Sequence, residues 1–90
     1  MAAESDTSAS TDTDTLLRTG LSHHRAGRLN DALACYRRIL QRDPDHADAN
    51  QLAGLVAKKA GDLATAIARM RAALAVRPDD AEVTYNLGNT

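Results

Sequence analysis

The side chains of this chain that could do chemistry are few, and their spacing does not suit a metal site. His23 and His24 are adjacent, so on a helix they would point about 100° apart and could not easily chelate one ion. His46 and the single cysteine, Cys35, stand elsewhere at no spacing typical of metal ligands. We therefore expect no bound metal, with His23 in the core of a helical hairpin and His24 facing the solvent.

A catalytic site has equally little support. Cys35 has no partnered histidine and acid in the sequence, so we interpret it as a structural thiol rather than a nucleophile. The acids of Asp43-Pro44-Asp45 belong to a turn between helices and are not a catalytic pair. The sequence contains neither a glycine-rich phosphate loop nor a nucleophile elbow. We predict that the protein is not an enzyme and binds no cofactor.

The composition indicates one small domain with no charge excess of the kind that binds nucleic acid. The chain has 90 residues and a formal net charge of −1, whereas a nucleic-acid-binding protein needs a concentrated basic face. The N-terminus lacks a basic region followed by an apolar run, and no apolar stretch approaches the roughly 18 residues of a membrane span. We expect a cytoplasmic protein that binds neither nucleic acid nor membranes.

The first 13 residues, MAAESDTSASTDT, differ in composition from the rest. They are Ser, Thr, Ala and acid with no hydrophobic periodicity, and they cannot bury enough apolar surface to offset the cost of ordering. We predict that residues 1–13 form a disordered acidic Ser/Thr-rich tail.

Helices separated by glycine and proline account for the remainder. We expect them at residues 14–26, 30–42, 47–60, 64–76 and from 81 to the last residue. The residues that mark their ends are Gly27, Pro44, Gly61 and Pro78. The expected N-caps are Asp45, Asp62 and Asp79, and Asp79 with Glu82 has the spacing of a capping box.

Apolar side chains recur at helical spacing in the second and fourth of these segments. The two stripes are Leu29, Ala32, Leu33, Tyr36, Ile39 and Leu40, and then Leu63, Ala66, Ile67, Met70 and Leu74. Such stripes indicate half-buried helices that pack against a neighbour.

The sequence overlays itself when it is shifted by 34 residues. The paired positions include Gly20 with Gly54, Ala26-Gly27 with Ala60-Gly61, Ala32 with Ala66, Leu40 with Leu74, and Pro44-Asp45 with Pro78-Asp79. A helix–turn–helix unit of this length resembles the tetratricopeptide repeat.

The positions of the family's pattern are filled mainly by small residues and proline. The first unit has Leu16, Thr19-Gly20, His23, Ala32, Tyr36 and Pro44; the second has Asn50, Ala53-Gly54, Ala57, Ala66, Met70 and Pro78; the third has Thr84 and Leu87-Gly88. The resemblance implies an all-α fold, a right-handed superhelix of antiparallel helical hairpins with about two and a half repeats. Repeat one would span 14–46, repeat two 47–80, and 81–90 would be the truncated first helix of repeat three.

Three glycines recur inside the first helix of each unit, where each costs about 0.8–1 kcal/mol relative to alanine. Their repetition suggests that the paired helix approaches closely at Gly20, Gly54 and Gly88. We expect Ala32 and Ala66 to face them from the second helix.

The resemblance implies a concave groove lined by the first helix of each repeat. The candidate groove residues are Leu17, Arg18, Leu21, His24, Arg25, Gln51, Leu52, Leu55, Lys58, Lys59, Tyr85, Asn86 and Asn89. Acids recur at the starts of these helices and bases at their ends. Complementarity with the helix dipole explains this pattern, and so does a groove with one acidic rim, one basic rim and an apolar floor.

The function that the resemblance implies is recognition of a protein or peptide. An alternative is the substrate-recognition arm of a larger bacterial glycosyl- or sulfotransferase whose catalytic domain lies outside these residues. Self-association through an uncapped C-terminal helix is a third hypothesis, because the fifth helix has no partner helix in this sequence.

Overall fold

The computed structural model describes residues 2–89, with side chains from Thr13 to Asn89. Its helices are α1 (Ala2–Arg25), α2 (Leu29–Arg42), α3 (Ala47–Lys59), α4 (Leu63–Val76) and α5 (Ala81–Gly88). The prediction of an all-α fold is confirmed. The tail predicted at residues 1–13 lies, apart from Thr13, outside the described side chains and stays a prediction.

The helix boundaries follow the glycines and prolines as expected. The predicted ends of the first four helices, and the predicted starts of the second to fifth, lie within one residue of those in the structure. The expectation that the fifth helix continues to the last residue was wrong. It ends at Gly88, and Asn89 is its C-cap.

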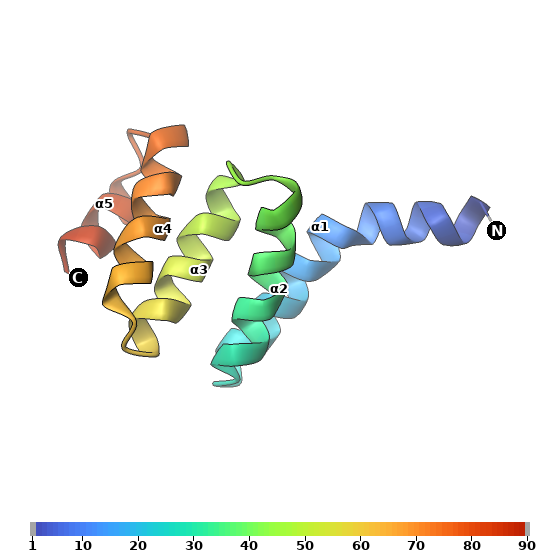
Figure 1. The fold of residues 1–90 in the computed structure, drawn as a ribbon, viewed down its shortest axis with the longest axis horizontal. Helices are drawn as coiled ribbons and strands as arrows, with labels where there is room; N and C mark the ends of the chain where they lie inside the picture. Colours follow the sequence, from blue (N-terminus) through green and yellow to red (C-terminus); the bar gives the residue numbers. More distant parts are fainter. Residues whose placement is uncertain (1, 90) are drawn as a thin grey trace.

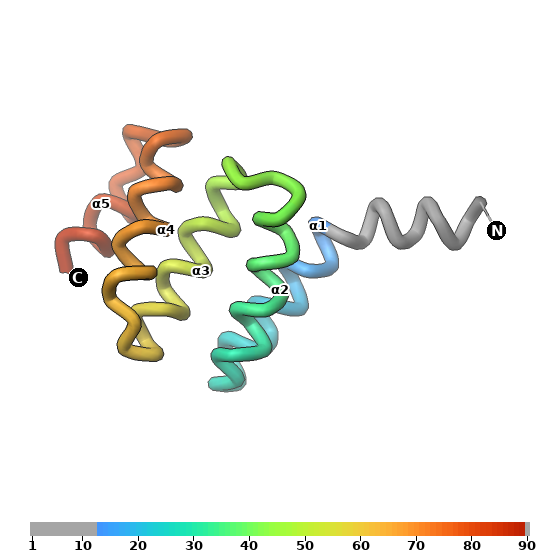
Figure 2. Tube along the Cα trace, viewed as in Figure 1, coloured from blue at the N-terminus to red at the C-terminus, as the bar shows by residue number. Residues whose placement is uncertain are grey.

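The helices pack as consecutive hairpins. α1 packs against α2 and α3 against α4, while contacts between α2 and α3 join the two hairpins and α5 packs against α4 (Figure 1). Figure 2 follows the chain through these hairpins in order, with each helix beside the next in sequence. In these contacts each helix packs against the helix before or after it in the sequence, which is typical of a repeat protein.

The turn inside each hairpin is built twice with the same bonds. The Arg28 amide donates to the His23 carbonyl at 2.8 Å, and the Asp62 amide donates to the Ala57 carbonyl at 2.8 Å. In both turns the preceding residue is a glycine with positive φ, of 80° and 86°. This backbone region favours glycine, and the bond pattern is that of a Schellman helix end.

The turn between hairpins also recurs. The His46 amide donates to the Asp43 carbonyl at 3.1 Å, and the Asp80 amide donates to the Arg77 carbonyl at 3.1 Å. Each bond closes a turn that contains a proline. Because the same turns repeat 34 residues apart, α1 and α3 occupy equivalent places in the two hairpins.

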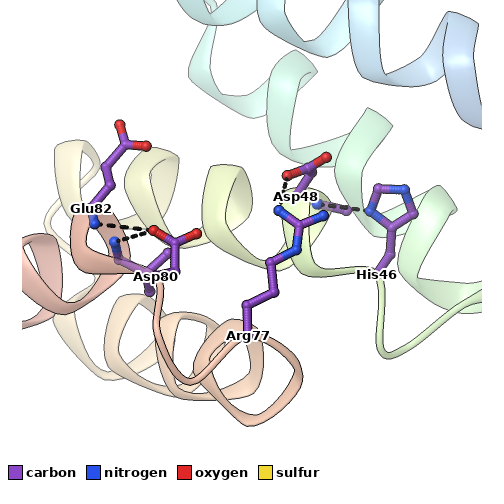
Figure 3. A network of polar contacts seen from close by, with 7 residues as sticks. His46, Asp48, Arg77, Asp80 and Glu82 are labelled. Atoms are coloured by element: carbon purple, nitrogen blue, oxygen red, sulfur yellow. Dashed lines mark hydrogen bonds and ion pairs between the residues drawn. The ribbon is translucent and has the colours of Figure 1, made fainter.

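These turns shift two of the predicted N-caps by one residue. Asp62 caps α4 as predicted, but Asp45 and Asp79 do not cap α3 and α5. Both lie inside the closed turn, so the next residues, His46 and Asp80, reach the extended backbone that a cap needs (Figure 3).

The predicted capping box at the start of α5 was wrong for the same reason. The Asp80 carboxylate accepts from the amides of Glu82 at 3.0 Å and Val83 at 3.2 Å. Glu82 is therefore the second residue of the helix, not the third, and cannot take the reciprocal role.

The close approach of paired helices occurs at two glycines. A Cβ atom on Gly20 would lie 2.5 Å from Cε1 of Tyr36, and one on Gly54 would lie 2.9 Å from Cγ of Met70. The expectation that Ala66 faces Gly54 is confirmed, since the Ala66 carbonyl oxygen would lie 3.2 Å from that Cβ. At Gly20 the three nearest atoms all belong to Tyr36, so the tightest contact there is not with Ala32. In both hairpins the nearest side chain comes from one turn further along the second helix, where a larger residue fills the space that glycine leaves.

Gly88 does not share this role. Nothing lies within 4 Å of the position that its Cβ would take. The expected packing reason for this third glycine is therefore absent from the described part of the chain.

Buried side chains form two clusters. One contains Ala32, Tyr36, Ile39, Leu40, Ala49, Ala53 and Val56, and the other contains Met70, Ala73 and Val83. The first joins α2 to α3 and the second joins α4 to α5, so each hairpin buries apolar area against the next. The two predicted stripes are confirmed as buried or half-buried, except that Leu63 is 48% exposed.

Tyr36 is buried completely, and its hydroxyl has no hydrogen-bond partner among the described residues. Burial raises the pKa of Tyr36 to about 12, with the nearby Cys35 thiol raising it further and Arg25 opposing the shift. A buried hydroxyl without a partner costs about 1–3 kcal/mol. The ring of Tyr36 therefore stabilises the hairpin, while its oxygen does not.

We expect Gly20→Ala to destabilise the protein, because the ring of Tyr36 is fully buried and cannot move aside. The overpacking cost of about 1–3 kcal/mol exceeds the roughly 0.8–1 kcal/mol that alanine gains in a helix. Thermal unfolding measures the difference. Gly88→Ala is the control and should leave the melting temperature unchanged or raise it. A Gly20→Ala protein as stable as the parent would contradict the close contact.

We expect Tyr36→Phe to raise the free energy of unfolding by about 1 kcal/mol, because it removes the unpaired hydroxyl and keeps the ring. Chemical denaturation at neutral pH measures this. The parent should also lose stability as the pH rises from 10 to about 12, since the unfolded tyrosine ionises at its ordinary pKa of 10.0 and the folded one does not. Tyr85→Phe, at a side chain 70% exposed, is the control. Destabilisation by Tyr36→Phe would mean that the hydroxyl has a partner.

Candidate functional site

The residues predicted to line a groove come from α1, α3 and α5, with Asn89 directly after α5, and each keeps some exposed surface. Arg18, Arg25, Lys59, Tyr85 and Asn89 are exposed, while Leu17, Leu21, His24, Gln51, Leu52, Leu55, Lys58 and Asn86 are half-buried. We call these residues the first-helix face. Its use as a groove stays a prediction.

The leucines of the first-helix face belong partly to the core. Leu17 and Leu52 pack against the cluster around Tyr36, and Leu55 packs against the cluster around Met70. These side chains stabilise the hairpins as well as offering apolar surface. The exposed Arg18, Arg25 and Lys59 are therefore more accessible to a ligand than the leucines are.

Two members of the face from different repeats interact electrostatically. Burial lowers the pKa of His24, and the Lys59 ammonium lowers it further. The end of α3 therefore lies within electrostatic range of the end of α1. His24 is half-buried, so it is less open to the solvent than predicted.

His23 is also placed differently from the prediction. It is half-buried rather than in the core, and its Nδ1 accepts a hydrogen bond from Arg28 Nε at 3.0 Å. This bond links the end of α1 to the start of α2 across the turn. His23 therefore supports the turn of the first hairpin.

The last turns of α1 and α3 form a basic edge. Arg25 ends α1 together with the two histidines, and Lys58 and Lys59 end α3. The negative end of each helix dipole favours such residues. We call Arg25, Lys58 and Lys59 the basic edge of the first-helix face.

One acid at the opposite end, Asp48, is already engaged in an ion pair. The Asp48 carboxylate accepts a bond from Arg77 Nη1 at 2.9 Å, with both side chains about half exposed (Figure 3). Such a partly exposed pair contributes about 0–1 kcal/mol. It ties the start of α3 to the end of α4, and it takes Asp48 out of the proposed acidic rim.

The sequence pattern did not identify the role of Asn50. This residue is fully buried, donates from Nδ2 to the Pro44 carbonyl at 2.9 Å, and accepts at Oδ1 from Arg69 Nη1 at 3.4 Å. It links the turn before α3 to α4. The available signal was an asparagine at a position where the repeat pattern calls for an aromatic side chain.

Nothing in the described part of the chain is built for metal or thiol chemistry. Cys35 is half-buried, and burial raises the pKa of its thiol, while Arg38 lowers it and Asp31 raises it to a smaller extent. Among the side chains of residues 13–89, no group of three or more His, Cys, Asp and Glu is placed to hold a metal ion. Within the described residues, no helix combines the length and apolar character that crossing a bilayer requires.

The interaction of His24 with Lys59 can be measured by NMR titration. We expect the pKa of His24 to lie below 6.5 and to rise towards that value in Lys59→Met, with Lys58→Met as the control. Because the folded pKa is lowered, the unfolded state binds the proton first and stability falls as the pH drops below 6.5. His24→Gln should remove that part of the acid sensitivity. An unchanged pKa in Lys59→Met would show that the two helix ends are apart.

The comparisons agree with this architecture. The sequence matches the tetratricopeptide repeat family over residues 13–46 and again over residues 52–90. No curated protein shows significant similarity to the chain. The hairpins repeat turn for turn, and a glycine of each first helix packs against the second helix of its hairpin. Together with the two consecutive matches, this shows that the chain belongs to the tetratricopeptide repeat family.

Proposed function

We propose that this chain is a binding module rather than an enzyme, and that it holds an acidic segment of a protein partner on the first-helix face. Tetratricopeptide repeats are protein–protein interaction modules and typically bind proteins or peptides. The choice of an acidic segment comes from the charges of this chain.

The observation that carries the proposal is the basic edge, where Arg25 ends α1 and Lys58 and Lys59 end α3. Interaction with the helix dipole favours cations at each helix end. The Lys59 ammonium also acts across the repeats, because it adds to the effect of burial in lowering the pKa of His24. An anionic ligand at this edge would offset that repulsion and favour the charged imidazolium.

The rest of the first-helix face supports the same ligand. Asp48 is paired with Arg77, so its carboxylate repels an acidic segment less than a free acid would. Tyr85 is 70% exposed on α5 and offers an aromatic surface of the kind enriched at protein interfaces. The face thus combines positive charge at one edge with an exposed ring and half-buried leucines.

Charge reversal at the basic edge tests the proposal. We expect Lys58→Glu with Lys59→Glu to weaken binding of a labelled, capped oligoglutamate peptide by about five- to tenfold. The salt dependence of binding should also become flatter, because fewer ion pairs form. Fluorescence anisotropy at low and physiological salt measures both.

A matched control separates a local site from overall charge. Arg38→Glu with Arg71→Glu makes the same change of charge at exposed residues of α2 and α4. We expect this control to affect binding much less, and circular dichroism should show that both double variants stay helical. Equal weakening of binding by the two double variants would contradict the proposal, and so would an unchanged affinity of the Lys58→Glu, Lys59→Glu variant.

A further inference from the structure

A second polar site lies away from the first-helix face. A depression of about 280 Å³ is lined by Arg37, Leu40 and Gln41 of α2 and by Arg69 of α4. Figure 1 shows α3 between these two second helices. All four lining residues stand on second helices, so the site is independent of the function proposed above.

Arg69 is held in place at this site. Its Nη1 donates to Oδ1 of Asn50 at 3.4 Å, and Asn50 is itself fully buried and anchored to the Pro44 carbonyl. The bond to Asn50 uses one of the five N–H donors of the guanidinium. The half-buried arginine therefore presents a positioned charge with donors remaining, rather than a freely moving one.

Arg37 supplies the second positive charge from the neighbouring hairpin. It is exposed. Hydrogen bonds from Thr65 lower the pKa of the Asp62 carboxyl, and Arg37 lowers it by a smaller amount. The Asp62 carboxylate is occupied in capping α4 through the Thr65 amide at 3.2 Å. No carboxylate is among the side chains that line the depression, so two guanidinium groups share it without an acid between them.

We propose that this depression binds a phosphate monoester, carried by a phosphorylated side chain of a protein partner. A phosphate monoester has a charge of about −1.5 to −2 at neutral pH and three acceptor oxygens. Two arginines and the Gln41 amide match that charge and number of acceptors, whereas a carboxylate would balance only one arginine. Leu40 gives an apolar wall for the carbon atoms of the side chain.

The size of the depression agrees with a single functional group. At about 280 Å³ it is smaller than most sites for drug-sized ligands, which have volumes of roughly 300–1,000 Å³. The site also spans two hairpins, since Arg37 belongs to the first and Arg69 to the second. Binding would therefore depend on the packing of one repeat on the next.

NMR titration of the whole chain with a short capped phosphoserine peptide tests the proposal. We expect the Nε–H signals of Arg37 and Arg69 to shift most, and the glutamate and serine versions of the peptide to bind at least about tenfold more weakly. Inorganic phosphate alone should shift the same two signals. Arg37→Gln and Arg69→Gln should each weaken phosphopeptide binding about tenfold.

Arg71→Gln is the matched control, because Arg71 is exposed, shares α4 with Arg69 and holds the repeat position equivalent to Arg37. It should leave phosphopeptide binding unchanged. If Arg69→Gln does not fold, Arg37→Gln still tests the proposal, because Arg37 is exposed and its replacement should leave the fold intact. The proposal is overturned if the glutamate peptide binds as tightly as the phosphopeptide, if the shifts centre on Lys58 and Lys59, or if Arg71→Gln has the same effect as Arg37→Gln.

Discussion

The close approach of the two helices in each hairpin is the constraint on which the rest of this structure depends. Gly20 and Gly54 carry no Cβ atom, and the space is filled by the ring of Tyr36 in one hairpin and the side chain of Met70 in the other. The chain has only two aromatic residues, so most of its buried area comes from Ala, Leu, Val, Ile and Met. With small side chains, dense packing is reached only when helix backbones come near one another. Each glycine lowers the intrinsic stability of its helix, and the closer packing of the two helices of the hairpin offsets that cost.

The repeated turns convert this local packing into an ordered array. Equivalent backbone bonds close the turn inside each hairpin, and another bond recurs in the turn between hairpins. Equivalent helices consequently present equivalent residues to the same side of the molecule. That arrangement brings Lys59 of α3 within electrostatic range of His24 of α1, and it places Arg37 and Arg69 at one depression. Both surfaces take side chains from two repeats, so neither exists within a single hairpin.

Polar side chains hold the second hairpin together as specifically as the apolar ones do. Asn50 is fully buried and joins the turn before α3 to Arg69, while Asp48 and Arg77 pair across the second hairpin. The buried carboxamide of Asn50 makes hydrogen bonds to the Pro44 carbonyl and to Arg69, and it thereby orients the Arg69 guanidinium. Tyr36 shows the opposite case, since its ring is required by the packing and its hydroxyl is left without a partner among the described residues. Asn50 therefore serves both the packing and a surface site, whereas Tyr36 serves the packing alone.

The sequence by itself determined the fold class, the repeat length and nearly all the helix ends. These depend on local chemistry, because glycine with positive φ and proline end helices wherever they occur. Three features were decided only by the tertiary structure. The caps moved to His46 and Asp80 because turn closure occupied Asp45 and Asp79. The side chains of Tyr36 and Met70 come nearest to the glycines because the crossing point of two helices is set by packing. Lys59 acts on His24, and Arg37 and Arg69 line one depression, because the placement of one repeat on the next depends on how hairpins stack, which no spacing within one helix encodes.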